Sequence, residues 1–199
     1  MARIVSSADE PLGTICFVLC SSGMRIGEVL ALRLDDLDFQ RKLIHVRASV
    51  YAGALGTPKS EASAASLPMP PVLATRLKVF LSSKHFRPSA LGLVFANRRG
   101  RPFSANKLRE KKLRPLLTSL GIKLAGFHAF WHGVATTLID GGASITTVGA
   151  QLRHSDPRIT LGLYAHVVPQ SQRDAVESLA STIGSGQLLT EVRIADSAN

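Results

Sequence analysis

Apolar side chains in the first part of the chain fall at helical spacing and are separated by turn residues. The run over residues 9–21 is apolar enough for a core helix and ends at a Ser-Ser-Gly turn. Ile26, Val29 and Leu30 then repeat at positions i, i+3 and i+4, which predicts a second helix leading to an Asp-rich turn. A third helix is predicted over 70–81, because two prolines open it and proline is favoured in the first helical turn.

A different periodicity separates the second of these helices from the third. Residues 43–50 alternate apolar and polar side chains, as a half-buried strand does. A passage rich in glycine and serine follows over 53–66, with a turn around Thr57-Pro58, and a short strand ends at Pro68. This order predicts a small antiparallel sheet with a hairpin.

The middle of the chain combines an extended segment with another helix. Residues 91–96 are expected to form a short buried strand or extended segment, and 97–100 a basic turn. Ser104 is placed to cap a helix whose leucines recur on one face. Pro115 should kink that helix, because proline removes one backbone hydrogen-bond donor.

The remaining sequence predicts helices joined by short turns. Three helices are expected after Gly121, over about 127–140, 144–152 and 157–164, and a last amphipathic segment over about 169–183. Glycine pairs, a capping serine and an Asp-Pro step mark the boundaries between them. The whole pattern predicts a mainly α fold with a small antiparallel β-sheet, an α+β class.

The composition is that of a globular domain. The chain has 199 residues, 45% of them hydrophobic, which is too apolar for intrinsic disorder. No apolar run reaches the roughly 18–20 residues that a membrane span needs, and no secretory signal pattern opens the sequence. Cys16 and Cys20 share one face of the first predicted helix, so we expect reduced core thiols in a cytoplasmic protein.

Positive charge dominates the chain and is concentrated in one stretch. Lys and Arg number 24 against 14 Asp and Glu, which gives a formal net charge of +10 and a sequence pI of about 10.3. Between positions 97 and 114 only Glu110 opposes the bases Arg98, Arg99, Arg101, Lys107, Arg109, Lys111, Lys112 and Arg114. Clustered bases fit a polyanionic partner, most simply nucleic acid, although a solvated helix face would have the same composition.

Two basic residues in the first half are candidates for chemistry, and each has a plainer alternative. Arg25 and Glu28 are three positions apart on one predicted helix, so the carboxylate could aim the guanidinium. The same spacing is common in ordinary surface ion pairs. Lys59 lies in the predicted hairpin, where a cation could reach a ligand, but alone it carries no information.

The second half adds three histidines and a tyrosine. His128 and His132 are one helical turn apart, a spacing compatible with zinc. A metalloprotease would need a glutamate between them, and no third ligand is evident, so we expect no metal. His154 precedes Tyr164 by ten positions, which could bring an imidazole and a phenol to one side of the fold.

Together, these groups resemble the motifs of the tyrosine recombinase (phage integrase) family, in the same order and spacing. Residues 22–38 contain Met-Arg-Ile-Gly-Glu and are similar to its arginine box, and 58–68, with Pro-Lys-Ser, to its lysine hairpin. Residues 127–132, Phe-His-Ala-Phe-Trp-His, resemble its His-x-x-Arg-His box. Residues 152–166, with Leu-Arg-His-Ser-Asp and Tyr-Ala-His, resemble its closing box, so the resemblance covers roughly 12–182.

The resemblance implies a tyrosine recombinase catalytic-domain-like fold and a DNA breaking and rejoining chemistry. In that family a tyrosine attacks a DNA phosphodiester and forms a 3′-phosphotyrosyl link without metal or ATP. By position, Tyr164 would be the nucleophile, and Arg25 would hold the non-bridging oxygens. Lys59 would protonate the leaving oxygen, His128 would take part in proton transfer, and His154 would donate to the phosphate.

The resemblance also implies the partners. Double-stranded DNA would be gripped by the basic turn and helix, through Arg98, Arg99, Arg101, Lys107, Lys111 and Arg114. No cofactor and no membrane are expected. The segment 169–183 could pack within its own chain or reach a second copy on DNA, as C-terminal segments of this family do.

Three features depart from the family pattern. Trp131 occupies the position of the second arginine, and an indole offers one N–H and no charge where a guanidinium offers five donors. Arg153 replaces the usual glycine before the late histidine and could in part supply the missing guanidinium, while Glu28 and His132 would support the site. The third departure is length: we expect a catalytic domain over 1–183 without the family's N-terminal core-binding domain, followed by a polar tail over 184–199.

The sequence leaves several functions open. The first is a recombinase or integrase catalytic domain, impaired by Trp131. The second is a catalytically inactive DNA-binding remnant of an integrase. A type IB topoisomerase would share the chemistry but fits the closing box less well, and a zinc hydrolase built on His128 and His132 is a distant fourth.

Overall fold

The fold is built from short helices and very short strands, and the computed structural model describes residues 1–56, 65–123, 125–153, 177 and 180–181. The helices are α1 (Ala2–Ser7), α2 (Leu12–Ser22), α3 (Ile26–Ala31), α4 (Pro71–Leu81), α5 (Ala105–Leu108), α6 (Arg114–Ser119), α7 (His128–Asp140) and α8 (Ile145–Leu152), with a 3₁₀ turn η1 (Leu34–Asp36) and a π-helical turn η3 (Arg109–Leu113). The strands are β1 (Leu37–Asp38), β2 (Leu43–Val46), β3 (Ser49–Tyr51), β4 (Ala54–Gly56) and β5 (Ala65–Pro68). The predicted mainly α fold with a small antiparallel sheet is confirmed.

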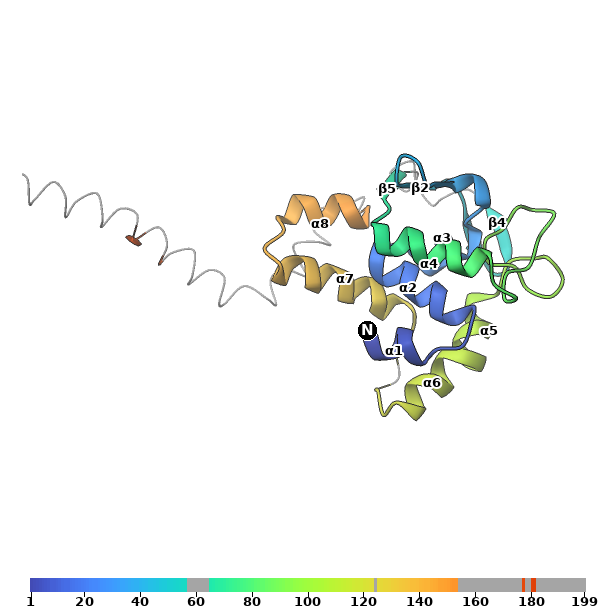
Figure 1. The fold of residues 1–199 in the computed structure, drawn as a ribbon. Coiled ribbons are helices and arrows are strands. Elements are labelled where there is room, and N and C mark those ends of the chain that lie inside the picture. The colour runs from blue at the N-terminus through green and yellow to red at the C-terminus, as the bar shows by residue number, and fades with distance from the viewer. Residues whose placement is uncertain (57–64, 124, 154–176, 178–179, 182–199) are drawn as a thin grey trace, which may run out of the picture.

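The strands form two small antiparallel sheets along one edge of the helices (Figure 1). One sheet has the order β1-β2-β5, and the other is the hairpin β3-β4. The single strand predicted over 43–50 is therefore two strands in different sheets. The tight turn of the hairpin was not predicted: Ala52 and Gly53 both have positive φ, as a two-residue turn between antiparallel strands requires. The turn predicted around Thr57-Pro58 lies outside the described residues.

The core joins α2, α3, α4 and the strands, and α7 with α8 forms a smaller cluster of its own. In α2 the Cys16 side chain is fully buried and Cys20 is half-buried, and burial raises their thiol pKa values to about 12 and about 11. Neither thiol is therefore ionised near neutral pH. The helix α1 was not predicted, and its Ile4 is buried against the core.

The basic helix follows the prediction at its start and contains an irregular turn ahead of Pro115. Ser104 caps it, accepting a hydrogen bond from the Lys107 backbone N–H at 3.4 Å. The π-helical turn η3 ends at Leu113, two residues before the proline, and the Arg114 N–H donates to the Arg109 carbonyl. This turn changes the backbone pairing next to a residue that cannot donate.

The helices α7 and α8 lie side by side at one end of the molecule (Figure 1). Both agree with their predicted ranges, and Ser144 caps α8 by accepting the Thr147 N–H at 3.1 Å. The helix predicted over 157–164 lies outside the described residues, as does the segment 169–183 apart from 177, 180 and 181. Among the described helices, none has the length and apolar character that crossing a membrane requires.

Two glycines shape the backbone on either side of Arg25. Gly23 ends α2 in the left-handed conformation at φ 68°, and a Cβ there would lie 2.9 Å from a methyl of Leu152. Gly27 lies in the first turn of α3, where a Cβ would lie 2.7 Å from the Val50 carbonyl oxygen. The missing side chains therefore let α8 and β3 approach the segment that carries Arg25.

We predict that Gly27→Ala destabilises the fold. Alanine should gain up to about 1 kcal/mol of helix propensity, but the rigid backbone of β3 would have to move, which costs roughly 1–3 kcal/mol. Urea unfolding of the whole chain measures the net effect. Gly56→Ala is the matched control, because a Cβ there meets only the Ser49 oxygen at 4.0 Å. Equal stability of the two variants would contradict the close approach at Gly27.

Candidate active site and nucleic-acid interface

Arg25 is held at the start of α3 by Glu28. It is the residue before the first helical turn, and its backbone N–H donates to Glu28 Oε2 at 2.8 Å. Its Nη1 also donates to Glu28 Oε1 at 3.2 Å. The Glu28 side chain is only 3% exposed, whereas that of Arg25 is 38% exposed. The carboxylate therefore fixes the guanidinium from the protein side and leaves part of it open to solvent.

Arg153, which lies 125 positions further along the chain, contacts the same carboxylate. It ends α8 in the left-handed conformation, at φ 53° and ψ 51°, and its Nη2 lies 2.5 Å from Glu28 Oε2. Its backbone carbonyl accepts a hydrogen bond from Arg25 Nη2 at 3.4 Å. Burial lowers the pKa of Arg153, with Glu28 acting in the opposite direction, but an arginine stays charged at neutral pH.

The first turn of α7 places three rings beside Arg25. The His128 and Trp131 rings stack with centroids 4.9 Å apart, and His132 meets both rings edge-on. The Arg25 guanidinium carbon lies 6.0 Å from the centre of the buried Trp131 ring, at the limit of a cation–π contact. The pKa of His128 is lowered, first by loss of water around the ring and then by the positive charges of His132 and Arg25.

The structure thus brings together six of the residues singled out for the site. They are Arg25, Glu28, His128, Trp131, His132 and Arg153. Lys59, His154 and Tyr164 lie outside the described residues, so their assignment stays a prediction. Within the described part of the chain, no group of three or more His, Cys, Asp or Glu side chains is arranged to hold a metal ion.

The basic stretch forms one wall of an open hollow of about 500 Å³. Arg101, Lys107 and Lys111 from the predicted set line it, and the hairpin residues Ala52 and Gly53 form part of its rim. Lys112 also lines the hollow, although the sequence prediction did not include it among the bases that contact DNA. Several ammonium groups lining one hollow suit a polyanion such as a phosphate backbone.

The remaining bases of the predicted set differ in their partners. Arg114 donates to Glu110 at 2.6 Å, and Arg109 shares the same carboxylate at 2.9 Å. These hydrogen bonds lower the pKa of Glu110, so it is ionised at neutral pH and partly neutralises both arginines. Arg98 and Arg99 are exposed in the turn before the helix.

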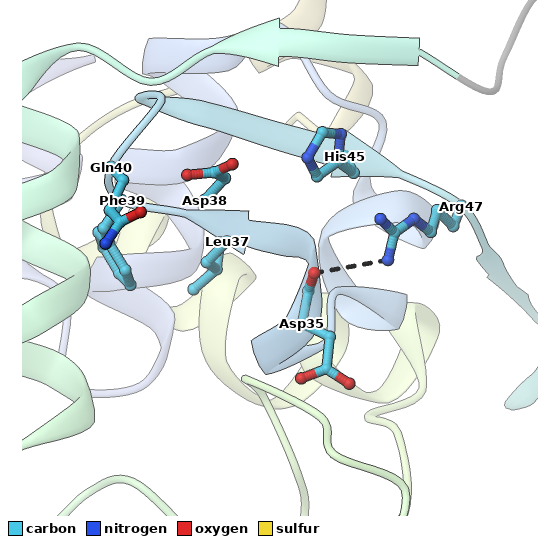
Figure 2. A pocket seen from close by; sticks show the side chains of 7 residues that line it. All are labelled: Asp35, Leu37, Asp38, Phe39, Gln40, His45 and Arg47. Atoms are coloured by element: carbon cyan, nitrogen blue, oxygen red, sulfur yellow. Dashed lines mark hydrogen bonds between the residues drawn. The ribbon is translucent and has the colours of Figure 1, made fainter.

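A second hollow, of about 490 Å³, lies beside β1 and β2 and has a mixed charge (Figure 2). Asp35, Asp38, His45 and Arg47 line it, and Figure 2 shows the Arg47 guanidinium reaching the Asp35 backbone carbonyl, a distance of 3.4 Å. Arg47 also pairs with the buried Asp36 at 3.2 Å. Because its arginine is engaged with the protein itself, this hollow lacks the concentration of cations found at the basic one.

Known proteins resemble this chain over most of its length. The profile of the Phage integrase family matches residues 2–171. A tyrosine recombinase XerC-like protein of Caldanaerobacter subterraneus subsp. tengcongensis is 29% identical over 181 residues, covering 79% of this chain and 46% of the relative. The integrase of Staphylococcus phage L54a is 26% identical over 176 residues, covering 81% of this chain and 49% of the relative. The chain therefore spans about half the length of the curated relatives it matches.

Solved structures share the fold. The Tn1549 transposon integrase, in complex with circular intermediate DNA, superposes with a TM-score of 0.77 at 22% identity, covering 90% of this chain and 64% of that chain. The XerA recombinase superposes with a TM-score of 0.70 at 23% identity, covering 89% and 60%. At such identities the superposition shows a common fold alone. Because the family profile extends over most of the 199 residues, the chain belongs to the phage integrase family of tyrosine recombinases.

Proposed function

We propose that this chain binds double-stranded DNA and cuts and rejoins it through Tyr164 as a site-specific recombinase or integrase catalytic domain. The observation that carries the proposal is the setting of Arg25, which is aimed by a buried carboxylate, partly exposed, and next to His128. A phosphoryl-transfer transition state gains negative charge on its non-bridging oxygens, so it needs a fixed cation there. Family membership and the solved complex of a relative with DNA support the same substrate class.

In the proposed reaction each step exchanges one phosphate ester bond for another. His128 takes the proton of the Tyr164 hydroxyl as its oxygen attacks the phosphorus, a bond to the tyrosine forms, and the bond to the 5′ oxygen breaks. Lys59 gives that leaving oxygen its proton, while Arg25 and His154 hold the non-bridging oxygens. Attack by a 5′-hydroxyl on the phosphotyrosine then rejoins the strand. Because the ester bond energy stays in the covalent intermediate, no nucleotide is consumed.

We expect this chemistry to be slow because of Trp131. The family's second guanidinium would donate hydrogen bonds to the transition state, and the indole brings no charge. Loss of one preorganised donor in other enzymes lowers the rate by about 10²–10³-fold. The stacked His128 and Trp131 rings keep the first turn of α7 in place, so the scaffold of the site is retained even where the donor is lost.

In this proposal the basic hollow binds the phosphate backbone of the DNA. Arg101, Lys107, Lys111 and Lys112 line it, and none of the described residues that line it is acidic. Each phosphate they neutralise would release counterions, which stabilises the complex most at low salt. Assembly on DNA through the segment 169–183 also belongs to the proposal.

A second candidate is DNA binding without turnover. The observation that favours it is again Trp131, because a buried aromatic ring occupies the position where the relatives' reaction needs a charged donor. This alternative keeps the basic hollow and the fold, and it differs only in what happens at Tyr164. Covalent trapping therefore separates the two candidates.

We predict that neutralising the basic hollow lowers DNA affinity and its salt dependence. Replacing Lys107 and Lys111 by glutamine should reduce the slope of log K against log salt by about 1.8, two contacts at about 0.9 each. Arg114→Gln is the control and should change the slope by much less, because Glu110 already neutralises part of that charge. Fluorescence anisotropy with a labelled duplex measures both. A slope that is the same in all three proteins would make the hollow an ordinary solvated face.

We predict that Tyr164 forms a covalent adduct with nicked duplexes and that Trp131→Arg raises its rate at least about tenfold, since a charged donor is restored. Tyr164→Phe should give no adduct. Gel shift after denaturation detects the covalent product. An adduct that survives Tyr164→Phe would remove that residue from its role. An adduct absent from the parent and present in Trp131→Arg would favour the second candidate, an intact scaffold without turnover.

A further inference from the structure

Arg153 is an unusual residue for its place in the fold. A left-handed backbone at the end of a helix favours glycine, and a charged side chain seldom lies inside a protein unpaired. Here a non-glycine residue adopts that backbone, and only 2% of its side chain is exposed. Within the described part of the chain, its Nε and Nη1 have no hydrogen-bond partner. The pair with Glu28 is therefore the main compensation for burying this charge.

The Glu28 carboxylate is shared by two arginines that lie 128 positions apart in the chain. Arg153 binds Oε2 through Nη2 at 2.5 Å, and Arg25 binds Oε1 through Nη1 at 3.2 Å. Arg25 in turn donates to the Arg153 carbonyl. The three residues form a closed ring of contacts that joins the start of α3 to the end of α8.

The net charge of these three residues explains why Arg153 matters. Without Arg153, Glu28 and Arg25 would form a neutral ion pair, and the Arg25 guanidinium would be fully engaged by the Glu28 carboxylate. With Arg153 the ring has two positive charges and one negative charge, so its net charge is +1. Arg153 is closed off from solvent while Arg25 is not, so the surplus charge is available to a ligand only through Arg25.

We propose that Arg153 is a positioning residue: by pairing with Glu28 it leaves the Arg25 guanidinium free for a DNA phosphate and holds it in place. This inference deepens the proposed function and rests on it for the identity of the ligand. It also gives a different role to Arg153 from direct replacement of the missing second guanidinium, because a side chain so deeply buried does not present its donors to a phosphate. Arg153 thus compensates for the positive charge that Trp131 lacks, although its own guanidinium does not contact the phosphate.

The first test is a double-mutant cycle in stability, made with Arg25→Gln and Arg153→Met on the whole chain. Methionine keeps an unbranched, flexible side chain, shorter than that of arginine, and removes the charge. Arg25→Gln should raise the unfolding equilibrium constant at least about tenfold more in the Arg153→Met background than in the parent, because Glu28 then loses its last cation. Additive effects would overturn the sharing of Glu28. Arg153→Lys, which keeps a cation, replaces Arg153→Met if the latter has no folded baseline, and it should show weaker coupling.

The second test is the same cycle in affinity for a labelled duplex, a readout that a merely structural role would not move. Arg25→Gln should weaken binding by about tenfold or more in the parent, the loss of a charged hydrogen bond, and by less than about threefold in the Arg153→Met background. Arg153→Lys should restore most of the difference. An equal loss in both backgrounds would overturn the positioning role.

The matched control is Arg47→Met, which removes a different arginine from a buried carboxylate, Asp36. In that background Arg25→Gln should weaken binding as much as it does in the parent. If Arg47→Met instead masks the effect of Arg25→Gln, the coupling reflects net charge and the positioning role is overturned. If the parent binds no duplex, the proposed function fails, and the unfolding cycle alone confirms or overturns the sharing of Glu28.

Discussion

The arrangement of the site depends on one buried carboxylate. Removing an ionised Glu28 from water is costly unless cations and hydrogen-bond donors surround it. The chain meets this requirement with the Arg25 backbone N–H and with guanidinium groups from α3 and α8. The same contacts that stabilise the carboxylate bring two distant segments together. The Glu28 carboxylate therefore both caps the start of α3 and holds the end of α8 against it.

The sequence predicted helices well where apolar spacing and end signals agree. The ranges expected for α4, α7 and α8 match the structure, because prolines open α4, a glycine pair follows α7 and a capping serine opens α8. It predicted the strands less well, since 43–50 divides between two sheets and the hairpin turn at Ala52 has no side chain typical of positive φ. Tertiary contacts decide the register of such short strands, so the sequence of a few residues predicts it poorly.

The sequence predicted which residues belong to the site better than it predicted the contacts between them. The motifs identified Arg25, His128, Trp131 and Arg153, and the structure brings them together. What spacing alone does not contain is that Arg153 turns inward to Glu28, a contact between positions 125 apart. The i, i+3 spacing of Arg25 and Glu28 is equally that of a surface pair, and only the burial of the carboxylate distinguishes the two cases.

The two departures from the family pattern are best understood together. A glycine at position 153 would remove backbone strain but leave Glu28 to Arg25 alone, and an arginine at 131 would add a charge beside Arg25. The chain instead has a buried indole at one position and a buried guanidinium at the other. The pair preserves the positive charge of the site while changing which residue presents it. Because the Arg153 charge is separated from solvent by Glu28, it can act on a ligand only through Arg25. Under the proposed function we therefore expect such a site to keep its affinity for anions more readily than its rate of bond cleavage.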